Sequence, residues 1–490
     1  MRRLKLTELQ SGIGLGIGER LIDLFLATRP LTHHLILLPT TRSPRKSRET
    51  VRHLREHLSK AARTSKALRS RAGPAYTPED ATSRVHILSP LLDLCDLVGV
   101  YATADRLVHG TVSNPSIDDA GKSPDPLTNV HVPRLDAVIF NAGYGGWHGI
   151  NYPAAGRMLF RYGIVQSCTW PDFKLARVGC VVTPQPRPSD LVPPPPSPLS
   201  RGAIAYDTKD PLEEQPPAPV IGEVFCANVF GHYCFAHALL PLLSRTEGEC
   251  REGGLSPGRI IWESSVEPAA RHFQLDDLQG VRSVGPYESS KRLTDILSLT
   301  HELPLASRHA ESFFHIADPV VANARTVRPR MYLTHPGVVA SSLFPTAAFI
   351  FFWYKLALFI TWLLGSPWHV VTSYIGATAP VWMAMASQEE LDEKKAQMSK
   401  WGSACGLDRV GQSKKTEVEG WGWEGVVLDK AALKSDTEKG ILKMVTGRNK
   451  LTVDTTKESR EEFEAMGAEC WKEMESLRRE WESNLGISDG

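Results

Sequence analysis

The chain has 490 residues, with 56 lysines and arginines against 55 acidic residues and a formal net charge of +1. The length exceeds one doubly wound α/β domain, and the near-neutral charge argues against nucleic acid as a partner. The eight cysteines show no Cys-x-x-Cys spacing and no His/Cys cluster with metal-ligand spacing. We therefore expect a reducing compartment, no disulfide framework and no metal site.

Strand and helix patterns alternate along the chain from residue 7 to about residue 342. A Gly-rich turn at 12–18 precedes a predicted helix over 19–27, and short apolar runs then predict strands. These runs are residues 34–38, 84–88, 135–140, 258–263 and 331–335. The alternation predicts an α/β fold with a doubly wound, Rossmann-type parallel sheet.

Two long insertions interrupt this pattern. Residues 109–134 are rich in Ser, Pro, Asp and Asn, and residues 183–220 contain a run of four prolines. Such compositions predict loop-like segments without a packed core. We therefore expect one domain over 1–342 that carries both insertions, an apolar segment over 343–386, and a charged, mostly helical extension over 387–490.

Tyr287 and Lys291 form the most informative pair of polar side chains. They stand four residues apart in a stretch with helical periodicity, so they share one helix face. The spacing alone also fits an ordinary helix face that is exposed to solvent. A phenol with an ordinary pKa of about 10 is a poor acid-base group at neutral pH, and a nearby cation lowers that pKa. Ser264 and Ser265 follow the strand over 258–263, where a hydroxyl can point at a ligand in the crevice of a parallel sheet or start a turn.

Taken in order, several short segments resemble the short-chain dehydrogenase/reductase family. The matching pieces are Asn141-Ala142-Gly143, Asn228, Ser265, Tyr287 with Lys291, and Pro336-Gly337. Residues 141–147, 222–233 and 400–403 are similar to the fungal branch of that family that reduces 3-keto-steroids. The animal relatives of this branch are the 17β-hydroxysteroid dehydrogenases of type 7. The resemblance covers most of the chain, tail included.

The resemblance implies a role for each catalytic residue. Tyr287 would donate a proton to the carbonyl oxygen as hydride arrives, and Lys291 would lower the Tyr287 pKa and hold the nicotinamide ribose. Ser265, rather than Ser264, would hydrogen-bond the substrate oxygen. Asn228 would hold a water that links Lys291 to solvent, although a lone Asn in an apolar helix also fits a satisfied core amide. Donors placed in advance where oxygen charge develops contribute mainly to rate.

The resemblance also implies an NADP(H) site at the strand ends. An acidic residue after the strand over 34–38 would bind a ribose 2′-hydroxyl, whereas Arg42 and its basic neighbours suit a 2′-phosphate. Asp93 resembles the family's carboxylate on the adenine side, and Asp96 is predicted to cap a helix. The other cofactor residues implied by the family pattern are Gly12, Ile13, Gly14, Asn141, Ala142, Gly143, Tyr287, Lys291, Pro336, Gly337, Val338 and Ser341.

The first turn departs from the family pattern. Gly12 and Gly14 fit it, but Glu8 stands where the first glycine belongs, and residues 1–6 are too short and too charged for a central strand. A carboxylate near a pyrophosphate opposes binding. We therefore expect that the true start lies upstream or that an exon junction is misassigned, which sequencing of the transcript tests. If the chain is real as written, nucleotide binding is reduced or absent.

An apolar segment follows the predicted domain. Residues 347–364 carry one charge, at Lys355, and at about 1.5 Å per residue they approach membrane thickness. A second apolar stretch covers residues 370–386, and the many aromatic residues suit a headgroup boundary. We expect a monotopic or re-entrant membrane contact. The alternative is a buried lid over the substrate pocket.

The resemblance implies NADPH-dependent reduction of the C3 ketone of C4-demethylated sterol intermediates to the 3β-alcohol in ergosterol biosynthesis. It implies a sterol ketone substrate, a place on the cytosolic face of the endoplasmic reticulum membrane or on lipid droplets, and other sterol C-4 demethylation enzymes as partners. Two alternatives stay open. One is a broader steroid or lipid carbonyl reductase with the same site. The other is a non-catalytic scaffold of the sterol C-4 demethylation complex, which the defective first turn favours.

Overall fold

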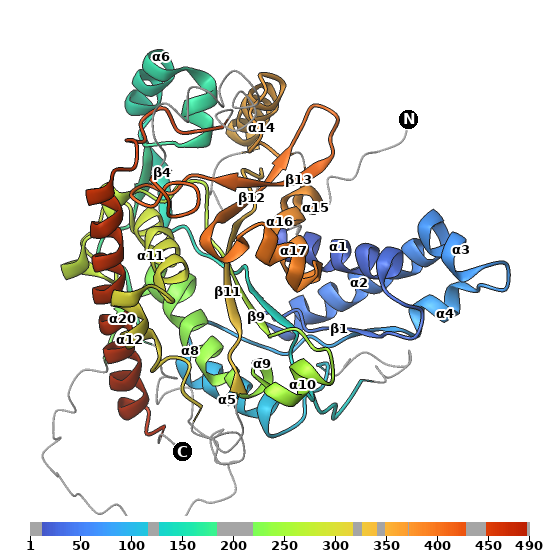
Figure 1. Ribbon diagram of the computed structural model, residues 1–490. Helices are drawn as coiled ribbons and strands as arrows, with labels where there is room; N and C mark the ends of the chain where they lie inside the picture. Colours follow the sequence, from blue (N-terminus) through green and yellow to red (C-terminus); the bar gives the residue numbers. More distant parts are fainter. Residues whose placement is uncertain are drawn as a thin grey trace, which may run out of the picture.

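The computed structural model describes residues 12–115, 127–183, 219–316, 326–340, 348–370, 372–427 and 447–487. Its centre is a five-stranded sheet in the order β13–β12–β11–β9–β3 (Figure 1). The strands are β3 (Ala137–Phe140), β9 (Arg259–Glu263), β11 (Arg330–His335), β12 (Lys400–Cys405) and β13 (Gly411–Thr416). The first four run parallel, and β13 pairs antiparallel with β12 at the edge. The predicted α/β fold with a parallel central sheet is confirmed.

The sheet is covered on both faces, which explains its continuous apolar strands. Ile260 and Trp262 of β9 pack into a cluster on one face, and Ile261 packs into a different cluster on the other. This is the two-residue period of a β-strand. Met331 of β11 lies beside Ile260 in the ladder, and both are at most 1% exposed.

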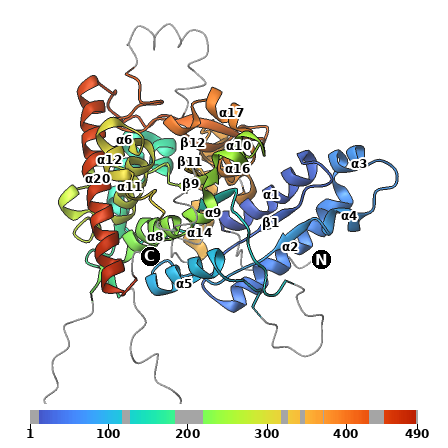
Figure 2. The same cartoon turned by 60° about the horizontal axis from the view of Figure 1, so that its bottom comes forward.

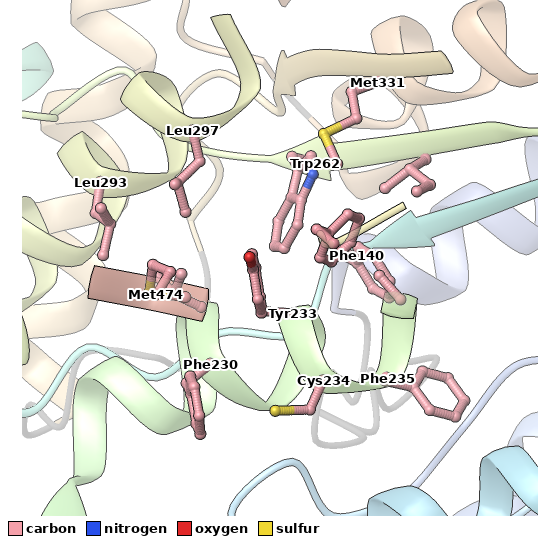
Figure 3. Close-up of a cluster of buried hydrophobic side chains, with 14 of the residues drawn as sticks. Phe140, Phe230, Tyr233, Cys234, Phe235, Trp262, Leu293, Leu297, Met331 and Met474 are labelled. Atoms are coloured by element: carbon pink, nitrogen blue, oxygen red, sulfur yellow. The ribbon is translucent and has the colours of Figure 1, made fainter. Parts of the chain in front are cut away.

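Three helices cover one face of the sheet. They are α8 (Gly231–Ala238), α11 (Pro286–Thr300) and α20 (Lys457–Asn484). Figure 3 shows Tyr233 of α8 among Trp262 of β9, Leu297 of α11 and Met474 of α20. The Trp471 indole of α20 donates a hydrogen bond to the Leu297 carbonyl at 3.2 Å. Side chains from the middle and from the end of the chain therefore share one core.

The boundaries expected at residues 342 and 387 do not separate folded units. β12 and β13 come after the apolar segment, yet they extend the central sheet next to β11. All six residues of β12 are buried, so this strand has no stable place apart from the sheet. Helix α20 runs alongside α11 and α12 (Pro304–Ala310), as both views show (Figures 1 and 2). The extension predicted over 387–490 is thus built into the α/β core.

A second, smaller parallel pair lies at the N-terminal side. It consists of β1 (Leu35–Leu37) and β2 (Val85–Ile87), with α1 (Ile13–Thr28) and α2 (Pro44–Thr64) packed on it. In the described part of the chain, no ladder joins this pair to the five-stranded sheet. Glu8 and the rest of the expected first strand lie outside the described residues.

The two halves of the apolar segment differ in their surroundings. Helix α14 (Ala348–Leu363) exposes Phe352 by 60% and Trp353 by 53%. Helix α16 (Thr378–Met385) instead packs on β9, β11 and β12 and is mostly buried. The expected membrane contact therefore does not extend to α16, because this helix packs on the second face of the sheet. Among the described helices, none combines the length and the apolar character needed to cross a bilayer.

A pair of strands joined by a helix follows β3, and the sequence patterns did not predict it. Strands β4 (Trp147–Ile150) and β5 (Lys174–Ala176) pair antiparallel, and α6 (Tyr152–Thr169) connects them. Helix α6 packs against α14.

Of the two predicted insertions, the ends of 109–134 meet through an isolated bridge. Most of the other one, residues 184–218, lies outside the described part.

The remaining elements connect these layers. Helix α5 (Leu97–Val108) begins after Asp96, whose carboxylate accepts a hydrogen bond from the Gly99 amide at 3.0 Å, so the predicted cap is confirmed. The others are α3 (Lys66–Ala72), α4 (Pro78–Thr82), β6 (Val181–Val182), β7 (Ile221–Gly222), α7 (Glu223–Phe225), η2 (Cys226–Phe230), α9 (Leu240–Leu243), β8 (Arg245–Thr246), α10 (Glu247–Arg251), η3 (Ala270–His272), η4 (Leu275–Asp277), β10 (Thr326–Val327), α15 (Ser373–Gly376), α17 (Gln388–Glu393) and η5 (Ala396–Met398).

Candidate active site

The structure brings the predicted tyrosine and serine together where β9 ends and α11 begins. Pro286 is the first residue of α11, a position where the backbone N–H would have no partner within the helix, so proline is well tolerated there. Tyr287 is the next residue. Ser265 lies two residues beyond the end of β9, and its hydroxyl is hydrogen-bonded to the Tyr287 phenol. Two hydroxyls arranged in this way can both donate hydrogen bonds to one substrate oxygen.

The phenol of Tyr287 is partly buried and lies between charged and aromatic groups. The Trp147 ring of β4 packs on it with a centroid separation of 4.7 Å. Burial and the Glu267 carboxylate raise the pKa of Tyr287 to about 12, and the Lys174 ammonium offsets only part of this rise. The direction is opposite to the lowering expected from the sequence, because the Lys291 ammonium lies 5.8 Å from the phenol ring centroid and is hydrogen-bonded elsewhere.

Lys291 is buried under the tyrosine, with 4% of its surface exposed. Its ammonium donates a hydrogen bond to the Glu263 carbonyl at 2.8 Å. Burial lowers the pKa of Lys291 to about 8 and raises the pKa of the Glu263 carboxyl to about 8. No group among the described residues hydrogen-bonds either oxygen of that carboxyl. The floor of the site therefore holds a cation and a carboxyl that both change charge near pH 8.

A buried ion pair lies one helical turn beyond Lys291. Lys400 of β12 donates to the two carboxylate oxygens of Asp295 at 2.9 and 2.7 Å, and the side chains are 2% and 1% exposed. The Ser264 hydroxyl donates to Asp295 at 2.6 Å and lies 3.2 Å from the Lys400 nitrogen. Ser264 therefore belongs to this ion pair, whereas Ser265 faces the phenol.

Asn228 occupies a π-helical turn, the element η2, a kind of turn that often occurs at functional sites. Its side-chain oxygen accepts a hydrogen bond from the Tyr144 amide at 2.6 Å, and its nitrogen donates to the Tyr144 carbonyl at 3.0 Å and to the Ser290 hydroxyl at 2.9 Å. The amide thus joins the loop after β3 to α11. It has partners, as a satisfied core amide would, and the water-holding role expected for Asn228 stays a prediction.

The glycines of the expected nucleotide turn lie against the loop after β3. Gly12 precedes α1 without a side-chain cap, Ile13 begins the helix, and the first turn of the helix carries no acidic residue. A Cβ atom at Gly14 would lie 3.1 Å from the side-chain nitrogen of Asn141. A side chain at this position would press against Asn141, so the glycine lets the start of α1 lie close to the loop after β3.

Ala142 and Gly143 are exposed in the loop after β3. A Cβ atom at Gly143 would lie 3.4 Å from the Asn228 side-chain oxygen and 3.8 Å from the Lys291 nitrogen. The backbone of Gly143 therefore lies next to two predicted catalytic residues, Asn228 and Lys291.

Arg42 and Asp93 follow β1 and β2, and their loops meet. An isolated parallel bridge joins Thr41 to Leu91. Arg42 is exposed, and the Asp93 carboxylate accepts a hydrogen bond from the Cys95 amide at 3.1 Å. The structure therefore places a free-standing guanidinium and an anchored carboxylate on neighbouring loops at one edge of the β1–β2 pair.

The Pro336-Gly337 turn after β11 has tight backbone contacts. Gly337 has a φ of +72°, a region that favours glycine, and a Cβ atom there would lie 2.6 Å from the Trp368 carbonyl oxygen. The Val338 amide donates to the same carbonyl at 2.6 Å. The turn is thus held by the segment that follows α14. Ser341 lies outside the described residues.

The structure also gathers charged residues that the sequence patterns did not single out. Lys174 forms ion pairs with Glu267 and Glu288 beside Tyr287. Nothing in the sequence around Lys174 signals this contact, whereas Glu263 could have been noticed as an acid inside an apolar strand. Among the described residues, no group of three His, Cys, Asp or Glu side chains could hold a metal ion.

Comparisons with known proteins give one consistent set of relatives. The chain is 51% identical over 483 residues to a protein of Gibberella zeae named 3-keto-steroid reductase ERG27, which covers 98% of this chain and 94% of that protein. It is 36% identical over 495 residues to the 3-keto-steroid reductase erg27 of Aspergillus fumigatus, with the same coverage of both chains. The protein of that name from Schizosaccharomyces pombe is 24% identical over 418 residues. A scan against models of protein families gives no match.

Proposed function

Because the chain belongs to the family of fungal 3-keto-steroid reductases, we propose that it reduces the C3 ketone of C4-demethylated sterol intermediates to the 3β-alcohol, with NADPH as the hydride donor. The observation that carries this proposal is the convergence of Tyr287 and Ser265 above the buried cation of Lys291. A carbonyl reductase needs an acid that gives up a proton at the substrate oxygen and a donor that stabilises the charge formed there.

The residues of the site divide this work between them. Tyr287 keeps its proton at neutral pH, because its pKa is raised to about 12. A bound NADPH would supply the hydride that C3 accepts. As C3 accepts the hydride, the Tyr287 phenol gives its proton to the former carbonyl oxygen, and the Ser265 hydroxyl donates a hydrogen bond to the same oxygen. The Lys174 ammonium beside the phenol stabilises the phenolate that remains.

Several features of the site fit a nicotinamide dinucleotide. Gly143 lies next to Lys291, and the first turn of α1, which holds Gly14, carries no acidic residue, so this helix start suits a pyrophosphate. The exposed guanidinium of Arg42 suits the 2′-phosphate that distinguishes NADPH from NADH. The proposal includes a Rossmann-type, doubly wound arrangement in which β1, β2 and β3 end at one nucleotide site, with Asp93 on the adenine side.

We also propose that α14 rests on a membrane, on the cytosolic face of the endoplasmic reticulum or on a lipid droplet. Phe349 is 72% exposed, and the exposed Phe352, Trp353 and Leu363 belong to the same helix. Exposed apolar patches mark contact sites, aromatic residues favour the headgroup level, and a sterol ketone is itself dissolved in lipid. In this position the enzyme would meet the other enzymes of sterol C-4 demethylation.

Vesicle flotation tests the membrane contact. The double variant Phe352→Ser/Trp353→Ser should lose most of its binding to phospholipid vesicles, because both rings are more than half exposed. Leu305→Ser is a matched control, since Leu305 is 48% exposed in α12, away from α14. Equal flotation of the double variant and the control would contradict the proposed contact.

The reductase activity is tested with purified protein, NADPH and a C4-demethylated 3-keto sterol. Tyr287→Phe removes the proton donor but keeps the ring, so turnover should fall by about 10²-fold or more. A reductase-deficient cell provides a second assay. Full rescue of sterol synthesis by Tyr287→Phe would refute catalysis and favour a scaffold role. Equal rates on unrelated ketones would favour a broader carbonyl reductase.

A further inference from the structure

A compact cluster of three charges, here called the Lys174 cluster, lies beside the proposed proton donor. It consists of Lys174, Glu267 and Glu288. Lys174 forms a close ion pair with Glu267 and a 2.7 Å ion pair with Glu288, and the three side chains are only 8%, 18% and 10% exposed. Removing three charges from water carries a large desolvation free energy, which is offset only when the charges form ion pairs with one another.

The cluster joins the two segments that carry the proposed catalytic hydroxyls. Glu288 directly follows Tyr287 at the start of α11. Glu267 lies two residues after Ser265, and its backbone amide donates to the Ser265 hydroxyl oxygen at 3.2 Å. Lys174 comes from β5, far away in the sequence, and bridges both carboxylates. One ammonium thereby fixes the serine segment relative to the tyrosine helix.

Lys174 also contacts the aromatic surface around the phenol. Its nitrogen lies 4.0 Å from the Trp147 ring centroid and 5.4 Å from the Tyr287 ring centroid. The two rings pack against each other with a centroid separation of 4.7 Å. A desolvated cation over an aromatic face is attracted by the ring quadrupole. The ammonium therefore positions the phenol through the Trp147 ring as well as through the two carboxylates.

The ionisable groups around the Tyr287 phenol come from several elements. The Lys174 cluster contributes one cation from β5 and two carboxylates, from the loop after β9 and from α11. Lys291 contributes a second cation 5.8 Å from the ring centroid, and Glu263 lies behind it. The three charges of the Lys174 cluster are the ones that act on the phenol, so removing any one of them changes the free energy of the phenolate.

We propose that Lys174 is a positioning residue of the reductase, which holds Ser265 against Tyr287 and balances the carboxylates beside the phenol. The inference rests on the proposed reductase function and adds a residue from outside the motifs that first pointed to the site. Lys174 stabilises the phenolate formed when the proton leaves, and Glu288 opposes it. The balance between them sets how readily Tyr287 acts as an acid.

The test compares Lys174→Met, Glu288→Gln and the double variant over a range of pH. Ketone reduction requires the protonated phenol. A first fall of activity is expected near pH 8, where Lys291 loses its charge, and a second at higher pH, where Tyr287 ionises; the second fall is the alkaline limit compared here. Lys174→Met leaves two carboxylates unbalanced and should move this alkaline limit upwards, with kcat near neutral pH about tenfold lower for each unit of pKa change. Glu288→Gln should move the limit downwards. The double variant has the same net charge as the wild type, so its limit should return towards the original value.

Two controls separate this role from a loss of folding. Lys415→Met removes the cation of another ion pair, with Glu424 at 2.6 Å, outside the site, and should leave kcat and its pH profile unchanged. Glu288→Gln keeps the ion pair between Lys174 and Glu267, so it remains informative even if Lys174→Met does not fold. Opposite shifts of the alkaline limit support the proposal. Shifts in one direction, or none, overturn it.

A measurement without substrate distinguishes this inference from the reductase proposal. The near-ultraviolet absorbance of tyrosinate is titrated in each variant, and the same variant that also carries Tyr287→Phe is subtracted, which isolates Tyr287. Opposite pKa shifts for Lys174→Met and Glu288→Gln would support the positioning role even if no sterol ketone were reduced. Unchanged titration in an enzyme that reduces the ketone would overturn the inference and leave the proposed function standing.

Discussion

Replacing Lys400 by methionine should destabilise the protein strongly while leaving its shape intact. Lys400 gives two charge-assisted hydrogen bonds to Asp295, and both side chains are at most 2% exposed. Each such bond contributes about 1.5–3 kcal/mol. Removal of one partner from a buried ion pair leaves the other charge uncompensated and costs about 3–5 kcal/mol. We therefore expect Lys400→Met to lower the free energy of unfolding by about 3–5 kcal/mol.

Guanidinium unfolding, followed by tryptophan fluorescence, measures this change as a lower midpoint with an unchanged slope. Asp295→Leu alone should cost a similar amount. The double variant Lys400→Met/Asp295→Leu replaces the pair by apolar side chains and should lie within about 2 kcal/mol of the wild type, because such replacements are often close to neutral. Costs that simply add, or a single-variant cost below about 1 kcal/mol, would refute the reasoning.

Three further predictions concern the turn, the floor and the cofactor edge of the site. Gly337→Ala should destabilise the protein by about 2 kcal/mol or more, measured by thermal unfolding, because φ is +72° and the new Cβ would lie 2.6 Å from the Trp368 carbonyl. The Glu263 carboxyl has its pKa raised from 4.5 to about 8 by burial, so the folded state holds a proton that the unfolded state releases. Stability should therefore fall as pH rises between these values, and Glu263→Gln should flatten that part of the stability curve; an unchanged curve would contradict it. Arg42→Ala should raise the KM for NADPH about tenfold to a hundredfold and leave that for NADH nearly unchanged, in steady-state assays.

The elements that the sequence predicted correctly are those whose signal is local. β3, β9 and β11 are short, continuous apolar runs that end in small or turn-forming residues, and such runs are typical of buried parallel strands. Tyr287 and Ser265 could be placed at strand and helix ends for the same reason. Their approach to each other follows from the connection, because the chain leaves the carboxyl end of β9 at Ser265 and begins α11 with Tyr287 in its first turn beside that end.

The parts that the sequence could not predict depend on contacts between distant residues. An apolar run such as 370–386 has the same hydropathy whether it meets lipid or the second face of a sheet, and only the packing of α16 decides. The pKa of Tyr287 depends on Glu267 and Lys174, which no spacing within α11 reveals. Lys400 stands in the stretch that was predicted as a charged extension, yet its ammonium is buried against Asp295.

The position of β12 in the sheet also bears on how the protein is made. A ribosome that has finished β9, α11 and β11 has not yet made the strand that lies beside β11, and Asp295 on α11 is still without its cation. The nascent chain must first deliver α14 and then α16 before Lys400 emerges. The fold is therefore completed only after α14 has left the ribosome, so the exposed aromatic helix is made before the last parallel strand of the sheet is in place.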